Sequence, residues 1–171
     1  TVALSASTDK TSTRASLSFR DQSGTTPNTD QKRYAMAVNT KMTFNKYIDF
    51  DLSANYIRTK SANLPGTGYN STNALQSIMQ WFGRQVDLKD LKNNWDQVDE
   101  YGKYTHYNWI QSFHANPYWT LNKNTNSYDR NRFYGKTSLY IKPTDWLKFE
   151  GRMGLDHYDS NQFSRILWNI D

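Results

Sequence analysis

The chain has 171 residues, a formal net charge of +5 and no cysteine. Without cysteine it forms neither a disulfide nor a thiolate metal site, and its 21 lysines and arginines are scattered along the sequence, which argues against a nucleic-acid-binding surface. Aromatic residues make up 15% of the chain, which is typical of a folded protein and not of a disordered one. No apolar run approaches the roughly 18 residues that a membrane-spanning helix needs.

Residues 1–60 are expected to form four β-strands, because apolar and polar side chains alternate there with a period of two. The expected strands are 2–7, 12–20, 33–44 and 48–58. In the last of these, Phe50 and Leu52 share one face and Asp51 lies on the other. Short polar turns join the strands within each pair, and a longer turn-rich segment joins the two pairs.

The alternation stops between residues 61 and 130, where we expect a long extracellular loop with structure of its own. Apolar residues at helical spacing predict a helix near 73–86; they are Leu75, Ile78, Met79, Phe82 and Val86. Its expected N-cap is Ser71 or Thr72, whose hydroxyl can accept a free backbone N–H. A second short helical turn is expected at 88–91. A loop of this length is usually functional.

Residues 131–158 are expected to form two further strands joined by a tight turn at Pro143. Residues 159–171 are expected to begin another loop. Six strands would then be connected by links that are alternately short and long, which is the asymmetry of outer-membrane β-barrels. Six strands are too few to enclose a wet lumen, so we expect the chain to be part of a larger barrel.

The side of the strands opposite the apolar residues carries charges that we expect to line this lumen. They are Arg14, Lys41, Asp49, Asp51, Lys136, Glu150, Arg152 and Asp156. In a soluble β-sandwich the same residues would face solvent, and alternation alone does not separate the two folds. Aromatic residues near the strand ends, such as Tyr34, Phe44 and Trp146, favour the transmembrane barrel, where such residues form interfacial girdles.

Four segments, taken in order and spacing, also carry a family resemblance. They are residues 5–24, 80–92, 116–132 and 144–156. The first ends in Asp-Gln-Ser-Gly, the third begins Asn-Pro-Tyr-Trp-Thr-Leu-Asn-Lys, and the fourth begins Thr-Asp-Trp-Leu. Together these segments resemble the SusC/RagA family of TonB-dependent outer-membrane transporters. The family's early barrel hairpin ends in a similar Asp-Gln-x-Gly step, and a helix in one of its loops is similar to 80–92.

The resemblance implies a barrel of about 22 strands with an N-terminal plug, in the outer membrane of a Gram-negative cell. It implies a SusD-type surface lipoprotein as a lid, energy from TonB, and oligosaccharides or peptides as substrates. This sequence contains neither a plug nor a TonB box. The TonB complex would therefore act through parts of the parent chain that are not present here.

The long loop is rich in aromatic residues that could hold a substrate, because flat rings stack on sugars or grip peptides. The expected substrate contacts are Tyr104, Tyr107, Trp109, Tyr118 and Trp119. Trp81 and Phe82 lie on the predicted helix, and for them we favour packing or contact with the lid protein. The alternative for every one of these residues is that they pack the loop against itself.

The sequence predicts no enzyme, no metal site and no cofactor. Asp49 and Asp51 lie on one face because they are two positions apart on a strand, which explains their spacing without catalysis. The histidines lack the spacing of a zinc site. The predicted function is therefore part of a nutrient importer. A soluble secreted β-sandwich that binds carbohydrate through surface aromatics is the alternative, and a surface-adhesion barrel without transport is a third possibility.

Overall fold

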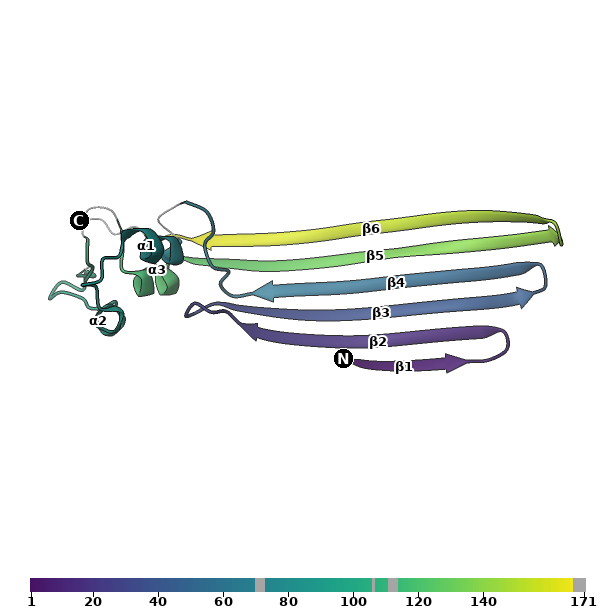
Figure 1. Cartoon of the computed structure of the whole chain (residues 1–171), viewed down its shortest axis with the longest axis horizontal. Helices are drawn as coiled ribbons and strands as arrows, with labels where there is room; N and C mark the ends of the chain where they lie inside the picture. Colours follow the sequence, from purple (N-terminus) through teal and green to yellow (C-terminus); the bar gives the residue numbers. More distant parts are fainter. Residues whose placement is uncertain (70–72, 106, 111–113, 168–171) are drawn as a thin grey trace. The chain divides into compact units, whose positions relative to one another are not determined.

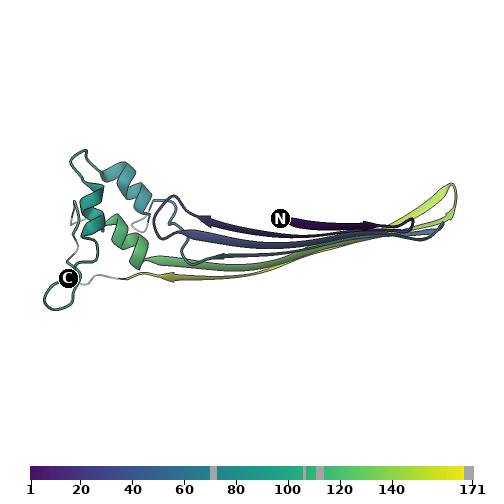
Figure 2. The ribbon, with the colours of Figure 1, turned by 90° about the horizontal axis from the view of Figure 1, so that it is seen from below.

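A computed structural model describes residues 1–69, 73–105, 107–110 and 114–167 of the chain. Within these ranges six strands lie side by side, in sequence order, in one antiparallel sheet (Figure 1). They are β1 (Val2–Ser7), β2 (Thr11–Ser23), β3 (Asp30–Asn45), β4 (Ile48–Ser61), β5 (Thr125–Thr144) and β6 (Leu147–Arg165). Figure 2 shows the strands as a single layer. The predicted all-β, antiparallel class is confirmed, and the sheet is open, as expected for a segment of a larger barrel.

Two strands extend much further than the sequence predicts, and β2, β3 and β4 are each longer by three or four residues. β5 begins at Thr125 instead of near 131, and β6 continues to Arg165, where a loop was expected from 159 onward. Side-chain contacts between the extended parts include a hydrogen bond from Ser127 Oγ to the carbonyl oxygen of Phe163, at 3.3 Å. Both faces of these extensions are largely polar, so no apolar alternation marks them in the sequence.

The chain forms two compact units. The sheet unit consists of Thr1–Asp21, Lys32–Lys60 and Asp129–Asn161, and it contains most of every strand. The loop unit consists of Gln22–Gln31, Ser61–Tyr128 and Gln162–Asp171. Each unit is described below by itself.

One face of the sheet unit is apolar, because the strand register brings like residues together. In the β3–β4 pair, Met42 lies opposite Phe50 and Val38 lies opposite Ala54, whereas Lys41 lies opposite Asp51 on the other side. Side chains on one face of an antiparallel pair are neighbours across the strands. The period-two pattern therefore becomes an apolar face and a charged face of the same sheet.

The apolar face remains exposed. Leu17, Val38, Leu52, Leu139 and Phe149 all belong to it, and they are 38–56% exposed. Among the described residues no second sheet covers them. A soluble β-sandwich needs such a sheet to form its core, and the part of the chain that the structure describes does not supply one.

Gly135 in β5 is a point of close approach between strands. A Cβ atom added there would lie 2.7 Å from the backbone oxygen of Ser53 in β4, which is too short for a carbon–oxygen contact. We expect Gly135→Ala to lower the free energy of unfolding by about 1–3 kcal/mol, as overpacking does elsewhere. Chemical unfolding of the purified protein measures this change.

Gly151→Ala in β6 is the matched control for this substitution. A Cβ atom added at Gly151 meets no atom within 4 Å. Because alanine loses less backbone entropy than glycine on folding, this variant should be unchanged or more stable by about 0.5–1 kcal/mol. Equal destabilisation by the two variants would show that the approach to Ser53 is not what requires glycine.

The loop unit contains three short helices, α1 (Ala74–Trp81), α2 (Leu88–Asn93) and α3 (Pro117–Lys123). The predicted helix near 73–86 is therefore present but ends at Trp81, and the predicted turn at 88–91 is α2. None of the helices in the described ranges is long and apolar enough to cross a membrane.

The N-cap of α1 differs from the prediction. Asn73 is the N-cap, and its side chain accepts a hydrogen bond from the backbone N–H of Gln76 at 3.2 Å. The predicted caps, Ser71 and Thr72, lie outside the described residues. The buried residues of α1 are the small Ala74 and Ser77, and the helix packs against α3. Of the larger apolar side chains on which the prediction of this helix was based, Leu75 and Met79 are exposed.

Candidate functional site

The residues predicted to line a lumen share the charged face of the sheet unit. Strand register places Arg14 opposite Ser5, Lys41 opposite Asp51, and Asp49 opposite Thr43. The remaining four alternate with the apolar residues of their strands; they are Lys136, Glu150, Arg152 and Asp156.

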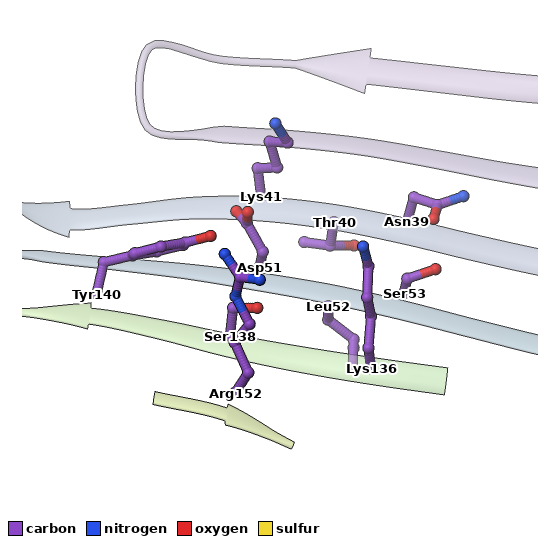
Figure 3. A pocket seen from close by; sticks show the side chains of 10 residues that line it. All are labelled: Asn39, Thr40, Lys41, Asp51, Leu52, Ser53, Lys136, Ser138, Tyr140 and Arg152. Atoms are coloured by element: carbon purple, nitrogen blue, oxygen red, sulfur yellow. The ribbon is translucent and has the colours of Figure 1, made fainter. Parts of the chain in front are cut away.

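A shallow hollow of about 510 Å³ lies over the middle of the charged face. Lys41, Asp51, Lys136 and Arg152 come from four different strands to line it (Figure 3). Ser138 also lines it, and is buried there. The sheet thus gathers hydrogen-bond donors, acceptors and charges on a wet, open surface.

Several of these charges are paired across the face. Lys142 Nζ lies 2.7 Å from Asp49 Oδ2, and Arg132 donates from Nε to Asp156 Oδ1 at 2.9 Å. Arg152 donates to Glu150 two positions earlier on the same strand.

Other cations of the charged face remain unpaired. In the described ranges Arg14, Lys41 and Lys136 make no ion pair. The face therefore carries an excess of positive charge and would attract anionic groups.

The loop aromatics predicted to bind substrate are placed in different surroundings. Trp119 is only 4% exposed and belongs to the core of the loop unit. Tyr104 is half-buried, with its ring 6.2 Å from that of Trp119 and 4.8 Å from the ammonium group of Lys123. Tyr118 is also half-buried, on α3. These three residues contribute to packing, and Trp119 is not accessible to a ligand.

Trp109 and the two predicted lid contacts form one aromatic cluster inside the loop unit. The ring of Trp109 meets that of Phe82 edge-on at 4.1 Å, and its Nε1 donates to the backbone oxygen of Trp81 at 3.2 Å. His114 lies 5.0 Å from the Trp81 ring and hydrogen-bonds Ser77. Packing of the loop against itself therefore accounts for much of what these aromatics do.

Tyr107 is the most accessible of the five predicted substrate contacts, at 40% exposed. Its hydroxyl donates to the carboxylate of Asp90, and this hydrogen bond raises the pKa of Tyr107 above its ordinary value. The pair presents a fixed carboxylate beside an aromatic ring, which can accept a hydrogen bond from a bound molecule.

Two more aromatic residues of the loop unit, outside the five expected substrate contacts, are exposed. Tyr69 and Tyr101 are 76% and 81% exposed. Tyr69 directly follows Gly68, whose φ is 81°, and Tyr101 directly precedes Gly102, whose φ is 76°. A tyrosine beside a glycine turn in a long loop was the available signal, because such turns project their neighbours into solvent.

The Asn-Pro-Tyr-Trp segment forms the start of α3 and ties the loop unit together. Asn116 is 2% exposed and accepts a hydrogen bond from the N–H of Tyr118 at 2.9 Å, as an N-cap does. Its amide donates to the backbone oxygens of Leu91 and Tyr107, each at 2.9 Å. One buried side chain thereby joins α2, α3 and the stretch that carries Tyr107.

The described residues contain no group of three or more histidine, aspartate or glutamate side chains placed to hold a metal ion. What the geometry offers is a charged, water-facing sheet surface and a separately packed loop with exposed tyrosines.

Comparison with known proteins identifies the fold. No family model and no curated protein matches the chain. A solved structure of the RagAB peptide importer in its "closed-closed" state contains a chain that matches with a TM-score of 0.65 and 16% identity, over 96% of this chain. A structure of the RagAB peptide transporter matches with a TM-score of 0.66 and 14% identity, over 95% of this chain.

The match covers only 18% of each of those longer chains. At these identities the likeness concerns the fold. The expectation of a RagA-type fold is thus confirmed, and this chain has the fold of one segment of a RagAB transporter chain.

Proposed function

We propose that the chain is a segment of the barrel wall of an outer-membrane nutrient importer. In this proposal the apolar face of the sheet contacts lipid and the charged face lines a water-filled lumen. The observation that carries it is the exposed apolar face, with Leu17, Leu52 and Phe149 at 38–56% exposure, on a RagAB-type sheet. Contact with lipid removes the cost of leaving such a face in water.

Peptides are the substrate class that we propose ahead of oligosaccharides. The matching solved chains belong to assemblies described as a peptide importer and a peptide transporter. The unpaired cations of the charged face, Arg14, Lys41 and Lys136, would attract the carboxylates of a peptide, whereas most oligosaccharides are neutral. Tyr101 and Tyr107, which are 81% and 40% exposed, are the loop residues that we propose for substrate contact.

A surface lipoprotein of the SusD type is the proposed partner of the loop unit. Leu75, Met79 and Trp81 of α1 are 45%, 83% and 41% exposed. Exposed apolar side chains of this kind favour contact with another protein. Energy from TonB would reach the transporter through other parts of the parent chain.

The proposal includes no catalysis. The carboxylates of the charged face repeat at two-residue spacing because the strands do, and Asp49 and Asp156 are engaged with lysine and arginine. Their arrangement supports charge balance along a wall.

Fractionation of cells that express the complete gene tests the proposed function. The protein should stay in the sedimented envelope after a carbonate wash and dissolve only with detergent. Deleting the gene should abolish uptake of labelled oligopeptides and leave uptake of labelled oligosaccharides unchanged. Recovery of the folded protein from the soluble fraction without detergent would contradict the membrane placement, and the opposite uptake pattern would contradict the peptide assignment.

A further inference from the structure

The apolar face of the sheet unit becomes charged toward the ends of the strands that lead to the long loops. Five residues of that face form what we call the outer charge cluster: Asp21, Lys32, Arg58, Lys60 and Asp129. They continue the parity of the apolar residues, since Tyr34 and Arg58 are direct partners across β3 and β4. The cluster therefore faces the same side as the proposed lipid-contacting surface.

Two lysines of the cluster lie directly opposite each other. Lys32 of β3 and Lys60 of β4 are register partners, and Arg58 lies two positions before Lys60 on the same face. Like charges directly opposite on a sheet are destabilising. Three cations are thus held together at the centre of the cluster, and an anion bound over them would relieve their repulsion.

The two carboxylates flank these cations. Asp129 accepts from Arg58 Nε at 3.1 Å and from Nη2 at 2.9 Å, and lies 3.3 Å from Lys60 Nζ. On the other side, Asp21 lies 3.6 Å from Lys32. Even with these partners the three cationic side chains are 40–46% exposed, and the cluster keeps one net positive charge.

The cluster lies immediately beyond a row of aromatic residues on the same face. The rings of Phe19 and Tyr34 are 5.0 Å apart, and the hydroxyl of Tyr56 donates to Asn131 at 2.8 Å. Tyrosine and tryptophan favour the boundary between hydrocarbon and headgroups. The next residues along β2, β3 and β4, which include the cluster, would therefore reach the level of the lipid headgroups.

We propose that the outer charge cluster binds a phosphate group of an anionic lipid in the outer leaflet. Lys32 and Lys60 contact the phosphate as point charges, and Arg58, held by Asp129, donates from the part of its guanidinium that the carboxylate leaves free. This inference rests on the proposed membrane placement. The proposed ligand is a lipid, because a lipid in the bilayer holds its phosphate at the headgroup level, directly beyond the apolar face of the sheet.

Native mass spectrometry of the complete protein in detergent tests the proposal. The probes are diphosphorylated lipid A, the same glycolipid without its phosphates, and inorganic phosphate. A variant with Lys32→Gln, Arg58→Gln and Lys60→Gln should lose about 100-fold in affinity for diphosphorylated lipid A, because each cation contributes about a fivefold factor. Binding of the dephosphorylated lipid should not change.

A second triple variant removes the same charge from the opposite face. Lys41→Gln, Lys136→Gln and Arg152→Gln together should leave lipid A binding within about twofold of the parent. Equal loss in both variants would overturn the proposal, because it would show an effect of net charge alone. Equal binding of the phosphorylated and dephosphorylated lipids, or competition by inorganic phosphate at equal concentration, would overturn it as well.

Folding is checked separately by the heat-dependent migration of the barrel in gels. If the first triple variant does not fold, Lys32→Gln alone serves, with an expected loss of about fivefold. A protein that folds and stays in the membrane but shows no preference for the phosphorylated lipid would refute this inference and leave the proposed function standing. A protein that never enters the membrane would refute both.

Discussion

Replacing Leu52 by arginine should lower the free energy of unfolding of the bilayer-inserted protein by about 2–4 kcal/mol. Leu52 lies near the middle of β4 on the apolar face and is 38% exposed. In the proposed placement an arginine there would put a charge near the midplane of the hydrocarbon, where it is not solvated. Guanidinium unfolding of the complete protein in phospholipid vesicles, followed by tryptophan fluorescence, measures the effect.

Ser53→Arg is the matched control, because it adds the same side chain one position further on the same strand. Ser53 shares the parity of Asp51 on the charged face of β4, whereas Leu52 shares the parity of Phe50 on the apolar face. An arginine there remains in water, so the stability should change by about 0.5 kcal/mol or less. If Leu52→Arg were as mild as Ser53→Arg, the apolar face would not meet lipid and the proposed function would fail.

Replacing Asn116 by alanine should destabilise the loop unit by about 3 kcal/mol or more. The substitution leaves the backbone oxygens of Leu91 and Tyr107 without their donor and the N–H of Tyr118 without its cap. Each buried group left unsatisfied costs about 1–3 kcal/mol. Hydrogen exchange should show the amides of α2 and α3 losing protection by about two orders of magnitude, which corresponds to this free energy.

Asn122→Ala provides the comparison within the same helix. The Asn122 side chain makes one hydrogen bond, from Nδ2 to the backbone oxygen of Tyr118 at 2.7 Å, and it is half-buried. Its loss should cost about 1 kcal/mol. Exchange rates that respond equally to the two substitutions would show that Asn116 does not hold the loop unit together.

The strands were predictable wherever one face is apolar and the other is charged. Phe50, Leu52 and Asp51 in β4 show that alternation clearly. The same rule failed from Thr125 onward in β5 and beyond 158 in β6, because a segment that is polar on both sides has no period to detect. Backbone pairing continues there without any signal in hydropathy.

The helices show a different limit. Helical spacing located α1, but the spacing does not show that the small Ala74 and Ser77 are its buried residues, or that the helix packs against α3. The helix α3 was not predicted, although Asn116 before Pro117 is a good start signal. Which loop tryptophan is buried depends on contacts between segments far apart in sequence, and no local pattern contains that information.

The length of the last two strands has a consequence for the height of the proposed barrel wall. β5 has 20 residues, or roughly 66 Å of extended chain, and about 45 Å along the bilayer normal at the usual tilt. The hydrocarbon layer is only about 30 Å thick. In the proposed placement β5 is therefore longer than the hydrocarbon layer requires, so this part of the barrel wall extends beyond the lipid into water.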